Sequence, residues 1–178
     1  RSTIDFDHQR HHHIEALTAE LGSDAKLVLH KDKSVALISM TAKLLAILLA
    51  KLGNLVPGGG IWLNTQRPEW NDANNALAGY GLSMVTLYYL HRFVDFFIQL
   101  YSESDAGSFM LPEETERCVR DLAKLFAQTN PETADSPKGR RVFMDAAGQI
   151  YETFRENLYT HGYSGTDKTI SRSELIEY

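Results

Sequence analysis

The stretch SPKGRRVFMDAAGQIYETFRENL, residues 136–158, decides the fold class. Its apolar residues recur at intervals of three and four, which is the spacing of one face of an α-helix. Ser136 and Pro137 stand where a helix places its N-cap and its first residue. The pattern therefore predicts a long amphipathic helix. Its apolar positions are Val142, Phe143, Ala146, Ala147, Ile150, Tyr151, Phe154 and Leu158.

Four further segments have helical patterns, namely residues 7–21, 35–52, 73–102 and 113–128. Residues 35–52 and 73–102 are apolar almost all round, which predicts contact with helices on several sides. Lys43 lies near the middle of residues 35–52, so we interpret this segment as a buried helix and expect no membrane span. Residues 27–29 give one weak strand signal. The predicted fold is all-α, with residues 1–178 forming a single helical domain or part of one.

Composition and charge are those of a globular domain with a core: 178 residues, 43% apolar and 23% charged. The net charge is −5 and the basic residues are scattered, so we expect no nucleic-acid partner. Cys118 is the one cysteine in the sequence, and it falls among the apolar positions of residues 113–128. A buried thiol that has no partner for a disulfide favours a reducing, cytoplasmic location.

The two ends of the chain predict that it is a fragment of a longer protein. It begins at Arg1 without an initiator Met or a signal-peptide pattern. Ser171 and Glu174 have the spacing of a capping box, which opens a helix only about two turns before Tyr178.

The segment of residues 54–72 joins the two apolar helical segments and is the predicted functional loop. Long irregular connections between buried helices commonly carry function. It contains the run Pro57-Gly58-Gly59-Gly60, which lacks the setting of a phosphate loop, and we interpret this run as a flexible turn. We expect the whole segment to line the largest polar cleft, because it is rich in aromatic and amide residues.

Glu69-Trp70-Asn71-Asp72 combines the groups that glycosidic bond cleavage requires. A protonated carboxyl must lie beside the leaving oxygen, and the apolar faces of a sugar ring pack on indole. These residues resemble the Trp-Asn-Asp motif of the six-hairpin glycosidase and phosphorylase superfamily, particularly cellobiose-phosphorylase-like enzymes with an Asp-Trp-Asn-Asp signature. The resemblance covers residues 67–90. The following Ala73-Asn74-Asn75 is less glycine-rich than the family pattern.

The resemblance implies that Asp72 is the general acid and that Trp70 contacts the sugar, with Glu69 standing where the family often has Asp. Asp72 and Glu69 are the catalytic candidates. The substrate-binding candidates are Trp62, Asn64, Gln66, Arg67, Trp70 and Asn71. It further implies part of an (α/α) barrel acting on an oligosaccharide or glycoside, with no cofactor. Inorganic phosphate would be the co-substrate of a phosphorylase, and the remainder of the parent chain would complete the site.

Several alternatives stay open at this point. Asp72 precedes a helical run and could be its N-cap, which would lower its pKa; Asn71 or Asn74 could take that role instead. Trp70 could belong to the core, and Arg67 could pair with Glu69 or Glu103. The whole chain could be a non-catalytic all-α interaction or scaffold module. We interpret His91 as a hydrogen-bonded interior residue, and we assign His8, His11, His12 and His13 to a solvated helix face.

Overall fold

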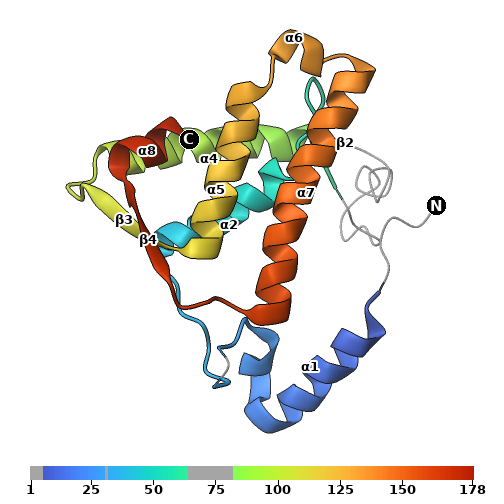
Figure 1. Ribbon diagram of the computed structural model, residues 1–178, viewed down its shortest axis with the longest axis vertical. Helices are drawn as coiled ribbons and strands as arrows, with labels where there is room; N and C mark the ends of the chain where they lie inside the picture. The colour runs from blue at the N-terminus through green and yellow to red at the C-terminus, as the bar shows by residue number, and fades with distance from the viewer. Residues whose placement is uncertain (1–5, 31, 64–81) are drawn as a thin grey trace.

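The computed structural model describes residues 6–30, 32–63 and 82–178. The described chain is mostly helical, with two small antiparallel sheets (Figure 1). In chain order the elements are α1 (His8–Leu21), the 3-10 helix η1 (Gly22–Lys26), α2 (Met40–Leu52), β1 (Ile61–Trp62), β2 (Leu82–Ser83), α4 (Met84–Ser102), β3 (Ser108–Pro112), α5 (Glu113–Gln128), α6 (Pro131–Ala134), α7 (Pro137–His161), β4 (Asp167–Ser171) and α8 (Arg172–Glu177).

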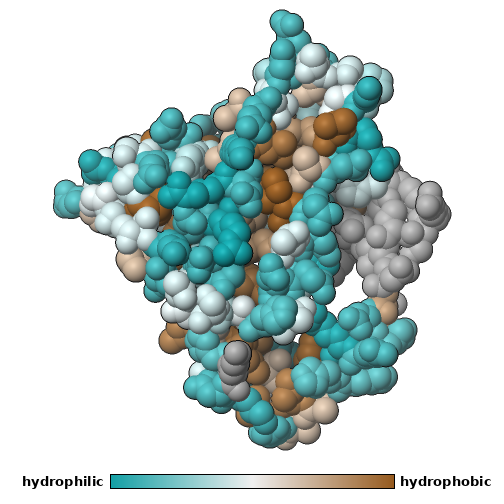
Figure 2. Space-filling view, in the orientation of Figure 1, coloured by the Kyte–Doolittle hydropathy of each residue, from teal (hydrophilic) through white to brown (hydrophobic). Residues whose placement is uncertain are grey.

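The long helix α7 confirms the pattern of residues 136–158. The Ser136 hydroxyl accepts the backbone N–H of Gly139 at 3.0 Å, and the helix ends where Gly162 adopts a φ of 72°. Phe143, Ala147 and Phe154 are buried on its inner face. Val142, which the pattern also assigned to that face, is 62% exposed. Helix α7 runs beside α5, and Figure 2 shows apolar surface between these two helices.

Helix α5 also has its predicted bounds. Val119 and Leu122 are buried as expected, and Cys118 is a free, buried cysteine. Phe126 makes an edge-on contact with Phe143, with 5.3 Å between ring centroids, but it remains 37% exposed. Helices α2, α4, α5, α7 and α8 together with strands β3 and β4 enclose one hydrophobic core.

Helices α2 and α4 begin later than their apolar runs suggested. The Ser39 hydroxyl accepts the N–H of Ala42 at 3.2 Å and caps α2, while residues 35–39 precede the helix. The Ser83 hydroxyl accepts the N–H of Thr86 at 3.1 Å and caps α4. Neither helix is covered on all sides as expected, because both carry exposed apolar residues, among them Ile47 and Phe96.

The fold is mainly α-helical, but the two small sheets show that it is not purely α-helical as predicted. Strand β3 pairs with β4 in antiparallel register, with Phe109 opposite Ile170. Each strand has only five residues, and Leu111 and Ile170 are completely buried within them. Such short runs contain too few alternating apolar positions to be recognised as strands. The weak signal at residues 27–29 corresponds to an isolated antiparallel bridge between Leu29 and Val35.

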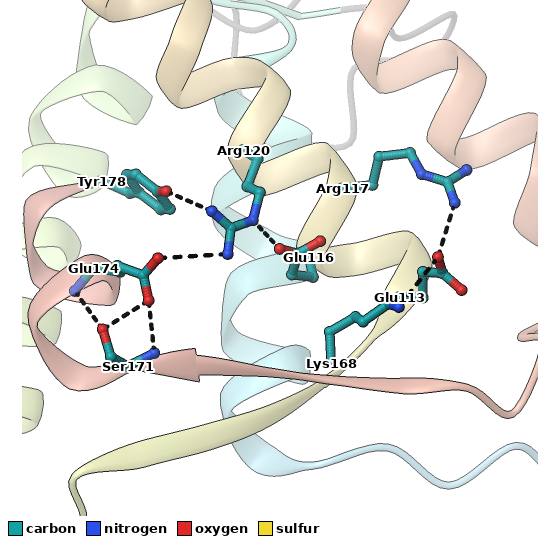
Figure 3. Close-up of polar contacts among 8 residues, drawn as sticks. All are labelled: Glu113, Glu116, Arg117, Arg120, Lys168, Ser171, Glu174 and Tyr178. Carbon is teal, nitrogen blue, oxygen red and sulfur yellow. Dashed lines mark hydrogen bonds and ion pairs between the residues drawn. The ribbon is translucent and has the colours of Figure 1, made fainter.

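Polar contacts hold β4 and α8 against α5 (Figure 3). The capping box is confirmed, because the Ser171 hydroxyl accepts the Glu174 N–H while the Glu174 carboxylate accepts the Ser171 N–H. From α5, Arg120 contacts Glu116 and lies 3.5 Å from the Glu174 carboxylate; it also donates to the Tyr178 hydroxyl at 2.9 Å. Most of these groups are partly solvated, so each pair contributes little alone and the network mainly orients the C-terminal helix.

One prediction about the histidines is confirmed and another is wrong. His8, His11, His12 and His13 are exposed along α1, as expected for a solvated face. His91 is not an interior residue. Its side chain is 75% exposed, and its Nδ1 lies 3.0 Å from an Asp95 carboxylate oxygen one helical turn away. In the described part of the chain, no helix is both long enough and apolar enough to cross a membrane.

Candidate functional site

Strands β1 and β2 flank residues 63–81, which contain most of the motif residues of the predicted functional loop, and we call this strand pair the loop base. Ile61 lies opposite Ser83 and Trp62 opposite Leu82 in an antiparallel pair. These strands flank the segment that carries the Glu69-Trp70-Asn71-Asp72 motif, so both attachment points of that segment are fixed together. The base is also tied to the end of α2, because the Trp62 N–H donates to the Asn54 carbonyl at 2.8 Å. Ser83 in turn caps α4.

The glycine run beside this base is closely packed, which corrects its interpretation as a flexible turn. An added Cβ at Gly60 would lie 2.9 Å from the Ser83 carbonyl oxygen, and one at Gly59 would lie 2.7 Å from a Leu82 methyl group. Gly58 has a φ of 63° and faces the Asp135 carboxylate. A side chain at any of these glycines would collide with a neighbour. The run therefore allows the turn to dock against β2 and the start of α7.

A close contact between α2 and α7 positions the end of α2. Gly53 is buried against Tyr151 of α7, and an added Cβ would lie 2.4 Å from the Tyr151 Cβ. Burial raises the pKa of the Tyr151 phenol, which keeps this side chain neutral at physiological pH. The backbone around residues 53–62 is thus held by packing on two sides.

Trp62 lies at a small pocket of about 200 Å³. The pocket is formed by the end of α2, the turn after it and the middle of α7, and the Trp62 ring is half-buried there. Asn54 is the polar side chain in the lining, and its amide N–H already donates to the Ala50 carbonyl at 2.9 Å. Among the described lining residues none is titratable. The proton donor for any reaction at the Trp62 pocket must therefore come from residues outside this lining.

Of the eight predicted site residues, Trp62 is the one that the structure describes. It lies in β1, beside this pocket, and its predicted role in substrate binding stays a prediction. The other seven fall outside the described residues. They are Asn64, Gln66, Arg67, Glu69, Trp70, Asn71 and Asp72.

Larger polar hollows lie at the opposite end of α7. One of about 840 Å³ lies among the start of α5, the end of α7 and residues 162–164. Another of about 660 Å³ lies between α1 and the end of α7. Residues 54–63 line neither hollow, so the described part of the loop does not form the largest polar cleft. The expectation for residues 64–72 lies outside the described part of the chain.

Glu114 is the most distinctive side chain of the larger hollow. One carboxylate oxygen accepts the Ser164 N–H at 2.9 Å, and the other is buried without a hydrogen-bond partner. Nearby Glu113 lies 3.4 Å from Arg117 and 3.8 Å from Lys168 (Figure 3). Sequence patterns did not predict this hollow, because acidic residues in the first turn of a helix are expected for electrostatic reasons alone. Among described residues, no group of three His, Cys, Asp or Glu side chains could hold a metal ion.

Comparison with known proteins gives no assignment: no protein-family model matches this chain, and no curated protein matches it.

Proposed function

We propose that this chain is part of a carbohydrate-active enzyme that cleaves glycosidic bonds by phosphorolysis or hydrolysis. Asp72 is the general acid, Glu69 is a second catalytic carboxyl, and Trp70 packs on a sugar ring. Asn71, Arg67, Gln66, Asn64 and Trp62 supply hydrogen bonds and aromatic surface to the substrate. The substrate is an oligosaccharide or another glycoside.

The fixed base of the loop is the observation that carries this proposal. A catalytic segment must be positioned to within a fraction of an ångström, which is easiest when both ends start from a rigid framework. The β1–β2 pair, the packed glycine turn and the Gly53–Tyr151 contact provide such a framework. The Trp62 pocket adds an aromatic wall that has no acid or base of its own among the described residues. The Glu-Trp-Asn-Asp motif supplies the groups that this wall lacks.

The proposed chemistry requires one proton donor at the leaving oxygen. In an inverting phosphorolysis a phosphate ion attacks the anomeric carbon, so a single carboxylic acid is sufficient. In an inverting hydrolysis water attacks, and a second carboxylate must remove its proton. Glu69 is close to Asp72 in sequence, but the parent protein could also contribute this base. Inorganic phosphate is a co-substrate only in the first case.

We extend the proposal to the setting of the domain. The mainly α-helical fold is compatible with part of an (α/α) barrel, and the remainder of such a barrel would complete the substrate cleft. The free, buried Cys118 is consistent with a reducing compartment, so we propose a cytoplasmic enzyme. The parent chain and the glycoside are then its partners.

Replacing Asp72 by asparagine in the full-length protein tests the proposal. The Asp72→Asn variant keeps the shape of the side chain but removes its proton, so turnover of an unactivated glycoside should fall by about two to four orders of magnitude. A glycoside with a better leaving group needs less protonation and should recover part of the loss. Assays with and without phosphate separate phosphorolysis from hydrolysis. Wild-type turnover in this variant would eliminate Asp72 as the acid, and Asn74→Ala provides a neighbouring control.

A non-catalytic interaction module is the second candidate function. The observation in its favour is the exposed apolar face of α4, where Tyr89 and Phe96 are 65% and 55% exposed. Such a surface is typical of a protein contact. Full-length protein that has no activity on any glycoside and keeps a stable partner would favour this alternative.

A further inference from the structure

A hollow of about 660 Å³ separates α1 from the end of α7, at the lower edge of the fold in Figure 1. Within α1, all of which the structure describes, no residue is buried. A helix of this length is marginal in water unless one face is packed, yet α1 does not fill the space before it. The α1 side chains that line the hollow are spaced by three and four residues, so they share one face of the helix. They are Arg10, His13, Ile14 and Leu17.

The wall opposite α1 is fixed to the end of α7. An added Cβ at Gly162 would lie 2.7 Å from the Leu29 carbonyl oxygen, so the backbone after η1 packs directly on this end. Arg10 tethers α1 across the hollow. Its guanidinium carbon lies 4.4 Å from the centroid of the Tyr159 ring, and the guanidinium donates to the Tyr159 carbonyl. The enclosed volume is within the range of about 300–1,000 Å³ that is typical of small-molecule pockets.

The polar part of the lining is basic, although the chain as a whole is acidic. The sequence has 23 acidic and 18 basic residues. In the described lining Asp7 is the one acid, and its carboxylate already accepts the Arg10 backbone N–H at 2.9 Å as the N-cap of α1. A histidine ring offers an N–H in its neutral form and is positively charged when protonated, so either form can bind an anion. The groups that can donate to an anion are Arg10, His13, Lys26, His30 and His161.

The C-terminal end of α7 opposes an anion, because the last carbonyl groups of a helix carry partial negative charge. Arg10 offsets this effect, since its guanidinium donates to the Tyr159 carbonyl at that end. This bond uses one of the five N–H groups of the guanidinium, so Arg10 can also donate to a ligand.

The remainder of the lining is apolar. Ile14 and Leu17 of α1 line the hollow together with Leu27 and Val28, which follow η1. Leu27 is 56% exposed, and the other three are only partly buried. Apolar surface is therefore left uncovered in this part of the hollow. Along α1 the polar lining residues precede the apolar ones, so the lining is divided into a basic part and an apolar part.

We propose that the hollow between α1 and α7 binds an amphipathic organic anion, with its acidic group among the basic residues and its apolar chain between α1 and residues 27–28. A medium-chain carboxylate is the simplest molecule of this class. An inorganic anion would leave the apolar part uncovered, and a neutral or cationic chain would leave the donors without an acceptor of negative charge. The hollow shares no described lining residue with the Trp62 pocket, so this inference does not rest on the proposed glycosidase function.

Calorimetric titration of the chain with four ligands tests the proposal. Octanoate has both required parts, 1-octanol and octylammonium keep the apolar chain, and acetate keeps the acidic group. Octanoate should bind at least about tenfold more tightly than each of the other three, because it alone matches both parts of the lining. It should also slow hydrogen exchange of the α1 amides, since a ligand in the hollow gives this helix a packing partner. Undetectable binding of octanoate overturns the proposal, and so does equal affinity for 1-octanol or acetate.

Two substitutions in α1 test the two parts of the lining. His13→Glu places a negative charge among the donors, and Leu17→Glu places one in the apolar part, so each should weaken octanoate binding by at least about tenfold. The matched controls are His12→Glu and Ala19→Glu, which introduce the same side chain at exposed positions of α1 that do not line the hollow. Both controls should bind octanoate like the wild type. Circular dichroism verifies that each variant keeps its helices. Binding that is unaffected by the two test substitutions, or weakened equally by the controls, contradicts this site.

Discussion

Replacing Gly60 by alanine tests the rigidity of the loop base directly. The new Cβ would lie 2.9 Å from the Ser83 carbonyl oxygen and 3.1 Å from its carbonyl carbon. Both are backbone atoms, so no side-chain rotation can relieve the contact. Either the β1–β2 pair separates or the glycine turn moves away from β2. Gly60 is buried, so we expect the cost of an overpacked site.

The expected loss in the free energy of unfolding is about 1–2 kcal/mol. Overpacking costs about 1–3 kcal/mol, and the lower entropy of an unfolded chain with alanine returns about 0.4–1 kcal/mol. Urea denaturation followed by circular dichroism measures this difference, and tryptophan fluorescence adds a local signal because Trp62 lies in β1. Under the proposed function, the same substitution in the full-length protein should also lower glycoside turnover, since it displaces an attachment point of the segment that carries the Glu69-Trp70-Asn71-Asp72 motif.

Gly107→Ala is the matched control for this experiment. Gly107 is exposed between α4 and β3, and an added Cβ would meet no atom within 4 Å. Its alanine variant should therefore differ from the wild type by no more than about 0.5 kcal/mol. If Gly60→Ala lowers the free energy of unfolding by no more than Gly107→Ala does, the glycine turn can move without cost and the β1–β2 pair is not held rigidly.

Three further predictions follow from burial and capping. Phe154→Ala should destabilise the fold by roughly 3–5 kcal/mol, because Phe154 is 7% exposed and truncation empties a buried aromatic site; a loss below about 1 kcal/mol in urea denaturation would contradict this. Burial raises the pKa of the Cys118 thiol to about 12. A thiol reagent at pH 8 should therefore modify the native protein far more slowly than the unfolded protein. The rate of modification of the native protein should rise with pH, because the thiolate is the reactive form. Equal rates in the two states would show an accessible thiol. Ser83→Ala removes the cap of α4 and should cost about 1 kcal/mol in thermal or urea unfolding, with an unchanged stability as the opposing result.

The helices could be predicted from the sequence because their signals are local. Pro137 at the start of α7 and the acids after Pro112 in α5 fix those helices within a few residues, and both were placed correctly. The β3–β4 pair was missed because it joins residues about sixty positions apart in the sequence. Each strand has five residues, and strand β4 buries Ile170 alone. A single buried position has no periodicity to detect.

The base of the candidate site was missed for a related reason. The run Pro57-Gly58-Gly59-Gly60 has the composition of a flexible turn, and composition alone does not reveal what lies against it. The partners that require glycine are Leu82, Ser83 and Asp135, which are distant in sequence. Trp62 was selected because its residue type suits a sugar ring, and the structure places it in β1, where it pairs with Leu82 of β2.

The N-cap of α4 bears on the role proposed for Asp72. In the sequence Asp72 stands directly before an apolar run that continues to Ser102, so it competes for the role of cap. The long helix begins instead at Met84, and the Ser83 hydroxyl accepts the Thr86 N–H. The first turn of α4 is therefore capped by Ser83, and the role of Asp72 lies outside the described residues. A general acid must deliver a proton to the leaving oxygen, so Asp72→Asn remains the direct test of the proposed donor. The two substitutions should then separate cleanly, with Ser83→Ala acting on stability and Asp72→Asn on turnover.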